Sequence, residues 1–151
     1  MKLTVITVGK KHDKQLAGAI AEFEKRLKSP FAFEWQFLPN SNFDGEKARA
    51  EESERLLRTI SPDDFVILCD ERGKNLSSPE FARVLSQKLL EKNVKIVIGG
   101  AFGVSPEFRQ RADLMWSFSR LVFPHQIVRL ILTEQIYRAQ EISRGGKYHH
   151  E

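Results

Sequence analysis

Residues 65–100 read FVILCDERGKNLSSPEFARVLSQKLLEKNVKIVIGG, and this stretch decides the fold. It contains two short runs of mostly apolar residues, 65–69 and 94–98. Nearly continuous apolar runs of this length are typical of strands in a parallel sheet that is covered on both faces. The segment between them predicts a helix, because Ser77 and Glu80 have the spacing of a capping box. The stretch therefore predicts a strand, a helix and a second strand that is parallel to the first.

The same alternation of strands and helices continues toward both ends of the chain. It contains no internal repeat, no low-complexity tract and no linker. The other predicted elements are strands at 3–8, 33–38 and 114–118, a helix after Asp13, a largely solvated helix over 44–60, a turn over 70–74, a short helix from about Ser105 and a long helix from about His125 to Ser143. We predict a single α/β domain over residues 1–151, with a parallel sheet and helices on both faces.

In such a sheet, ligands bind in the loops after the carboxyl ends of the strands. These loops are expected at 69–76, 99–104 and 118–125. Residues 99–103 read Gly-Gly-Ala-Phe-Gly, which allows a ligand to approach the backbone closely. The motif is neither G-x-G-x-x-G nor a phosphate loop, which disfavours a dinucleotide or nucleoside triphosphate site. By itself the motif is better explained as a tight turn between a strand and a helix.

The composition excludes several classes of protein. The only cysteine, Cys69, cannot form an intramolecular disulfide, and no Cys/His cluster has the spacing of a metal site. The apolar run near the N-terminus is too short for a signal peptide, and no run approaches the roughly 18 residues of a membrane span. We expect a cytoplasmic protein with no membrane segment and no metal.

The charge distribution permits a polyanionic partner without requiring one. The formal net charge is +4, and residues 41–75 contain nine acidic and six basic residues, so the positive charge lies toward the two ends. On charge alone, solvated surface charge is the favoured explanation, and RNA binding needs a second argument.

The predicted last helix is apolar around most of its circumference. In the run Ile127–Leu132, apolar side chains point in almost every direction about the helix axis. Such a helix is buried on more than one side. A homodimer interface and burial inside the monomer are both consistent with this pattern.

The most specific motifs lie in the C-terminal third. Residues 116–129 contain S-F-S and F-P-H-Q, residues 132–139 contain E-Q-I-Y-R-A, and residues 147–149 read K-Y-H. In this order, and with Ile98-Gly-Gly before them, the motifs resemble the bacterial RlmH family. That family consists of small SPOUT-class methyltransferases that modify N3 of a pseudouridine in 23S ribosomal RNA. The resemblance runs the whole length of the chain.

The resemblance implies a SPOUT-like fold with a C-terminal trefoil knot, a homodimer, and 23S rRNA within the ribosome as partner. It also implies S-adenosyl-L-methionine as cofactor, held by the knot loops. Where the family commonly has Leu, this chain has Cys69, and an apolar or main-chain contact to adenine survives that exchange. The implied cofactor-binding residues are Cys69, Gly99, Phe118, Ser119, Arg120, Leu121, Val122 and Phe123.

The resemblance also gives a role to the polar, glycine-rich tail over residues 144–151. A free tail of this composition would ordinarily be solvated. In the family context Tyr148 is a catalytic candidate that stacks on the base or hydrogen-bonds to it, and His149 accepts or relays its proton. His125 follows Pro124 and is expected to be structural.

Three basic residues, Arg129, Arg138 and Lys147, are candidates for RNA binding. For the two arginines, salt bridges to Glu134 or Glu141 are the alternative. Two other functions remain open: a related knotted methyltransferase that acts on tRNA, and a non-catalytic RNA-binding protein of ribosome assembly.

Overall fold

The computed structural model describes residues 1–150. The chain alternates strands and helices, as the sequence predicts. The strands are β1 (Leu3–Val8), β2 (Phe33–Leu38), β3 (Phe65–Asn75), β4 (Val94–Ile98) and β5 (Leu114–Ser117). The helices are α1 (Lys14–Glu24), α2 (Gly45–Arg58), α3 (Ser78–Glu91), α4 (Pro106–Arg111) and α5 (His125–Ser143).

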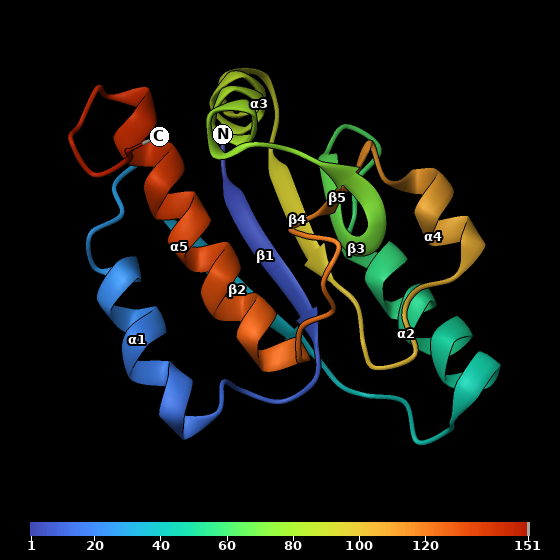
Figure 1. Cartoon of the computed structure of the whole chain (residues 1–151). Coiled ribbons are helices and arrows are strands. Elements are labelled where there is room, and N and C mark those ends of the chain that lie inside the picture. Colours follow the sequence, from blue (N-terminus) through green and yellow to red (C-terminus); the bar gives the residue numbers. More distant parts are fainter. Residues whose placement is uncertain (151) are drawn as a thin grey trace.

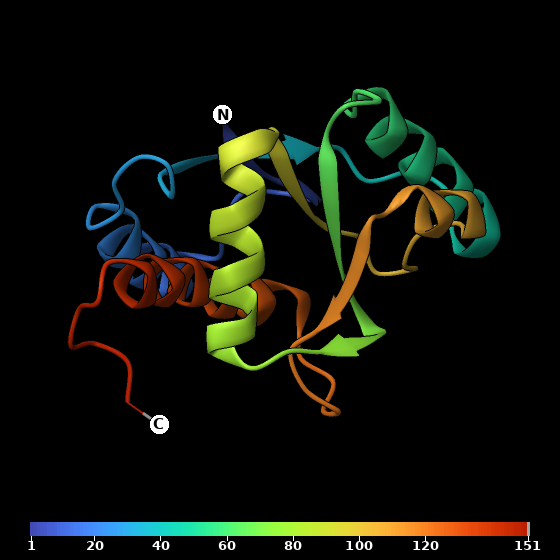
Figure 2. The same cartoon turned by 90° about the horizontal axis from the view of Figure 1, so that it is seen from above.

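The strands form one sheet in the order β2-β1-β4-β3-β5, and every neighbouring pair is parallel. Helices α1, α3 and α5 cover one face of the sheet, and α2 and α4 cover the other (Figures 1 and 2). The predicted α/β fold with a parallel sheet between two helical layers is therefore confirmed.

Alternate residues of the buried strands supply the two cores. In β4, Val94, Ile96 and Ile98 join the core beneath α1, α3 and α5, whereas Val97 joins the core beneath α2 and α4. Because both faces are covered, nearly every position of the strand is buried, which explains its continuous apolar run. Helix α3 begins with the predicted capping box between Ser77 and Glu80.

The predicted turn over residues 70–74 is wrong, because β3 continues to Asn75. Its register against β5 shifts between Cys69 and Lys74, so the residues between them bulge out of the ladder. Beyond the bulge, the Asn75 side-chain amide donates to the Ser117 carbonyl over 3.0 Å. Gly73 permits this pairing, since a Cβ there would lie 2.5 Å from the carbonyl carbon of Met115. The residues that predict a turn in the sequence instead belong to a strand that a long bulge interrupts.

The prediction of a largely solvated helix over 44–60 is only half right. One face of α2 is charged and exposed, but Ala48, Glu52, Ser53 and Leu56 are buried. Two of these four side chains are polar, so the buried face of α2 does not appear as a row of apolar residues in the sequence. Their partners lie outside the helix: Ser41, in the loop before α2, for Glu52, and Ser105, 52 residues further along the chain, for Ser53.

Helix α5 has the predicted bounds and is buried mainly within the chain. Leu132, Ile136 and Ala139 lie in the core, where α5 packs against α1 and α3. Ile127 and Ile131 are half-buried. Burial inside the monomer thus accounts for part of the apolar circumference, and these two residues remain available to a further partner.

Candidate functional site

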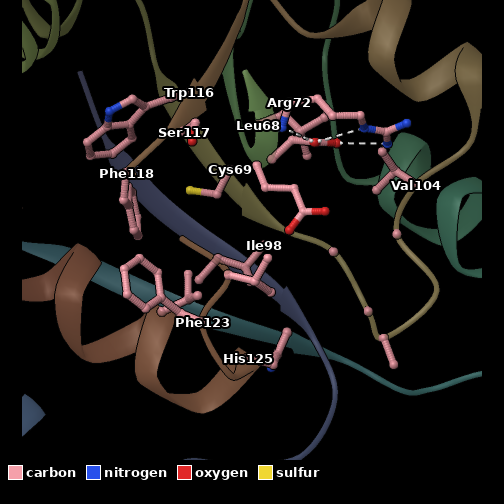
Figure 3. Close-up of a pocket in the computed structure, with 18 of the residues that line it drawn as sticks. Leu68, Cys69, Arg72, Ile98, Val104, Trp116, Ser117, Phe118, Phe123 and His125 are labelled. Atoms are coloured by element: carbon pink, nitrogen blue, oxygen red, sulfur yellow. Dashed lines mark hydrogen bonds and ion pairs between the residues drawn. The ribbon is translucent and has the colours of Figure 1, made fainter. Parts of the chain in front are cut away.

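The loops after β3, β4 and β5 meet at the carboxyl edge of the sheet and enclose a pocket of about 630 Å³ (Figure 3). These are the three loops at which the sequence predicts a ligand site. Seven of the eight predicted cofactor-binding residues line the pocket, and Arg120, which is exposed, does not. The seven are Cys69, Gly99, Phe118, Ser119, Leu121, Val122 and Phe123.

One wall of the pocket is aromatic and firmly packed. Trp116 is 3% exposed and stacks on Phe81, with ring centroids 4.0 Å apart. The ring of Phe118 meets Trp116 edge to face at 4.6 Å. With Leu68 and Ile98, these side chains leave an apolar slot that suits a flat heteroaromatic ring.

The opposite wall is the glycine-rich loop over residues 99–104. It closes on itself through a hydrogen bond from the Gly103 amide to the Gly100 carbonyl, 3.0 Å long. Gly103 has a φ of 76°, a value that glycine adopts without strain. A Cβ at Gly99 would lie 2.9 Å from Cγ1 of Val104, so the two ends of the loop pack directly against each other. The loop therefore presents backbone to the pocket.

Cys69 contributes an apolar surface. Burial, together with the negative charge of Asp70, raises the pKa of its thiol well above the ordinary range. The thiol therefore stays protonated, which fits the predicted contact to a ligand and does not fit a nucleophile.

The bulge of β3 adds a charged rim that the sequence-based list of site residues missed. Asp70 and Arg72 both line the pocket, and the Arg72 guanidinium lies 3.2 Å from the Asp70 carboxylate. Figure 3 shows Arg72 at the rim, with its interactions drawn as dashed lines. Arg109 approaches the same carboxylate at 3.7 Å. Burial alone would raise the pKa of Asp70, but the hydrogen bonds and charge of Arg72, helped by Arg109, hold it below its ordinary value. The register break that creates this rim has no signature in the sequence.

His125 lies at the first turn of α5 and lines the pocket. Its Nε2 lies 3.4 Å from Oγ1 of Thr7, and the ring also makes a hydrogen bond with the backbone of Gly99. Burial and the charge of Arg129 lower the pKa of His125. A neutral imidazole therefore joins α5, β1 and the glycine-rich loop, in keeping with the expected structural role.

The predicted RNA contact of Arg129 does not fit the structure. Its side chain is fully buried, and Nη1 donates to the Lys10 carbonyl over 2.8 Å and lies 3.3 Å from Nδ1 of His12. The guanidinium also lies over the Phe37 ring, 5.5 Å from its centroid. Arg129 holds the loop after β1 in place, and phosphate cannot reach it without a rearrangement.

Arg138 makes the predicted alternative contact, a salt bridge to Glu134 of 2.7 Å one turn away. The same Glu134 carboxylate accepts a 2.8 Å hydrogen bond from the Tyr148 hydroxyl, and Arg138 lies over the Tyr148 ring. Nη1 of Arg138 lies 3.0 Å from Nδ1 of His149. Because a guanidinium can only donate, Nδ1 of His149 is the acceptor in this contact. The tail is thus fixed to α5 of its own chain.

Tyr148 and His149 do not line the pocket of their own chain. His125 marks the pocket end of α5, and Glu134 lies nine residues further along, about 14 Å at the rise of an α-helix. Figure 1 shows the tail folded back beside the far end of α5. Lys147 is exposed on this tail. The structure therefore separates the predicted catalytic pair from the predicted cofactor loops.

No group of three or more His, Cys, Asp or Glu side chains within residues 1–150 is arranged to hold a metal ion. Over the same residues, no helix combines the length and the hydropathy that crossing a membrane requires.

The fold and the pocket define an α/β protein whose ligand site lies at the carboxyl edge of a parallel sheet. A family model described as "Predicted SPOUT methyltransferase" matches residues 1–149. The chain belongs to the SPOUT methyltransferase family.

Similar proteins cover the full length. The chain is 45% identical over 159 residues to Ribosomal RNA large subunit methyltransferase H of Carboxydothermus hydrogenoformans, and 41% identical over 158 residues to the protein of that name from Desulfitobacterium hafniense. Each alignment covers 99% of both chains. A probable methylase family protein from Haemophilus influenzae shares the fold, with a TM-score of 0.54 at 13% identity over 99% of this chain and 70% of that chain.

Proposed function

We propose that this chain is an S-adenosyl-L-methionine-dependent methyltransferase that modifies N3 of a pseudouridine in 23S ribosomal RNA. The observation that carries the proposal is a pocket formed by the family's motif loops in a chain that matches rRNA methyltransferases from end to end. The motifs F-P-H-Q and Y-H favour the family that modifies pseudouridine over other rRNA methyltransferases.

The pocket fits the proposed cofactor. The apolar slot between Trp116, Phe118 and Ile98 suits adenine, and the backbone at Gly99, Leu121 and Phe123 can supply hydrogen bonds. When bound, the cofactor supplies a methyl group on a positively charged sulfonium. The chain itself has to hold the acceptor nitrogen in line with that methyl, exclude water and take up the N3 proton.

The tail is the proposed source of the groups that meet the base. Since the Tyr148 hydroxyl donates to Glu134, its oxygen can accept a hydrogen bond from an N–H group such as N3–H. Nδ1 of His149 is engaged with Arg138, so His149 can act as a base at Nδ1 only if that contact opens. The separation of this tail from its own pocket supports an arrangement in which it serves the pocket of a second copy.

A homodimer is part of the proposal. Leu121 is 68% exposed and Val122 is 76% exposed, at the rim of the pocket and next to the start of α5. Ile127 and Ile131 extend this apolar surface along the helix. A second copy that packs on this surface would bury it and bring a tail to each pocket.

The trefoil knot is likewise proposed on the family resemblance. The path of the chain supports it: β5 lies at one edge of the sheet, and the chain then returns past the loop after β4 to pack α5 beside α1 (Figures 1 and 2). A cytoplasmic location follows from ribosomal RNA as the substrate.

The decisive experiment is methyl transfer to purified ribosomes, free 23S rRNA and tRNA, with the product nucleoside identified by mass spectrometry. We expect N3-methylated pseudouridine in 23S rRNA and no transfer to tRNA. Transfer to tRNA alone would favour the rival knotted methyltransferase. Absence of cofactor binding in calorimetry would favour a non-catalytic assembly protein.

A further inference from the structure

Helix α2 braces the back of the glycine-rich loop that forms one wall of the pocket. Nε of Arg49 donates to the Phe102 carbonyl over 2.9 Å, and Oγ of Ser53 accepts the Ser105 amide over 2.8 Å. In Figure 1 the loop after β4 runs directly alongside α2. Between Arg49 and Ser53 on this helix, Glu52 faces the same loop.

Glu52 is a buried carboxylate, 3% exposed, with only one of its two oxygens satisfied. Oε2 accepts the Ser41 amide over 2.9 Å, whereas Oε1 has no hydrogen-bond partner within residues 1–150. Glu52 also forms no ion pair there. A buried carboxylate in this state is costly, so its retention calls for a compensating interaction.

Oε1 of Glu52 lies directly behind the pocket wall. A Cβ built on Gly100 would lie 2.5 Å from this oxygen, and Gly100 lines the pocket. Only the backbone of the loop therefore separates the carboxylate from the ligand space. Because Oε1 is shielded from solvent, a negative charge on Glu52 would act on the pocket with weak screening.

Resting on the proposed function, we propose that Glu52 is a specificity-determining residue that favours the cationic cofactor over the product of its reaction. S-adenosylmethionine carries a positive sulfonium, and S-adenosylhomocysteine has a neutral thioether in its place. The two ligands are otherwise nearly the same. Glu52 touches neither of them and acts across Gly100, so that it favours binding of the methyl donor and release of the spent cofactor.

The test is calorimetric titration of both ligands into the full-length protein and its Glu52→Gln variant. Gln keeps the size of the side chain and an oxygen for the Ser41 amide, and removes the charge. We expect the affinity for S-adenosylmethionine to fall about 3- to 30-fold, because the variant no longer attracts the sulfonium, and that for S-adenosylhomocysteine to change less than about 2-fold.

Ser53→Ala is the matched control. It removes a hydrogen bond from the same helix to the same loop without changing charge, so both affinities should fall by the same factor. Glu52→Asp keeps the charge and should retain the preference. If Glu52→Gln does not fold, Glu52→Met provides a neutral variant of similar length that removes the unpartnered carboxylate oxygen, at the cost of the hydrogen bond from the Ser41 amide.

If Glu52→Gln lowers the affinity for both ligands by the same factor, Glu52 only supports the loop and the inference is overturned. Two unchanged affinities would overturn it as well. Both results leave the proposed function intact. Failure of the unaltered protein to bind S-adenosylmethionine would instead overturn the proposed function.

Discussion

Gly99 packs against Val104, at the other end of the glycine-rich loop that forms one wall of the pocket. A branched side chain at this position would strike the side chain of Val104 and crowd the backbone of Gly103. Val104 belongs to the same glycine-rich loop as Gly99. A larger side chain at Gly99 would therefore force open the loop whose backbone faces the proposed cofactor site.

We therefore expect Gly99→Val to lose binding of S-adenosylmethionine by at least about 100-fold while the protein stays folded. Isothermal calorimetry measures the affinity, and circular dichroism checks the fold. Gly18, which has open space around it, provides the control variant Gly18→Val. Unchanged affinity in Gly99→Val would remove this loop from the cofactor site.

His125 makes stability depend on pH. Burial and Arg129 lower its pKa from the ordinary value of 6.5, so the unfolded chain takes up this proton more readily than the folded chain. The contribution of neutral His125 is present above about pH 6.5 and is lost as pH falls toward the folded pKa.

We expect the melting temperature to fall between about pH 7.5 and about pH 5.5, and to fall less in His125→Gln. Differential scanning calorimetry across this range checks the difference. His12, whose pKa is also lowered by burial and Arg129, retains part of the slope in the variant. Parallel curves for the two proteins would contradict the assignment.

Among the elements, the tail after α5 is ordered by side chains that the helix presents to it. The Glu134 carboxylate, the Arg138 guanidinium and the Tyr148 ring hold it in place, and the Gly146 amide donates to the Glu141 carbonyl over 2.8 Å. Within residues 1–150 the last buried apolar residue is Ala139, and the last buried polar residues are Gln140 and Glu141. The tail can therefore be removed without opening the core.

Truncation after Gly146 should leave folding and cofactor affinity intact while methyl transfer falls sharply. His149→Ala should lose about 10²- to 10⁴-fold if the ring carries the proton, and much less if it only positions RNA. Single-turnover rates on ribosomes measure both variants, and a pH–rate profile should lose one ionisation in the first case. A fully active truncated protein would exclude the tail from catalysis.

For the whole molecule, the proposed dimer depends on the apolar surface of α5. Ile131→Asp would place a charge in that interface, where an unpaired buried charge costs several kcal/mol. We expect monomers by light scattering, with methyl transfer lost. Leu90→Asp, at a position that is 80% exposed on α3, is the control and should remain dimeric. An active Ile131→Asp monomer would refute the dimer requirement.

Mixing two inactive variants tests whether sites are shared between copies. A Gly99→Val protomer retains its tail, and a protomer truncated after Gly146 retains its cofactor loop. If the tail serves the partner's pocket, heterodimers rebuild one intact site and regain up to half the activity per dimer. Heterodimers that stay inactive would show that tail and loop of one chain must cooperate.

The sequence by itself determined the parallel α/β fold, because continuous apolar strands and a capping box are local signals. It also determined the three ligand loops, since parallel strands place their carboxyl ends at one edge of the sheet. The bounds of α5 followed from its apolar run, which starts after Pro124.

Only the tertiary structure decided the roles of the charged residues. Arg129 reads as a surface cation in the sequence, yet α5 buries it beneath the loop after β1. Glu52 reads as part of a solvated helix, yet it lies behind Gly100. The bulge of β3 depends on a backbone contact between Gly73 and Met115. Such contacts join residues that are far apart in the chain, so no local pattern records them, whereas apolar periodicity is local and can be read directly.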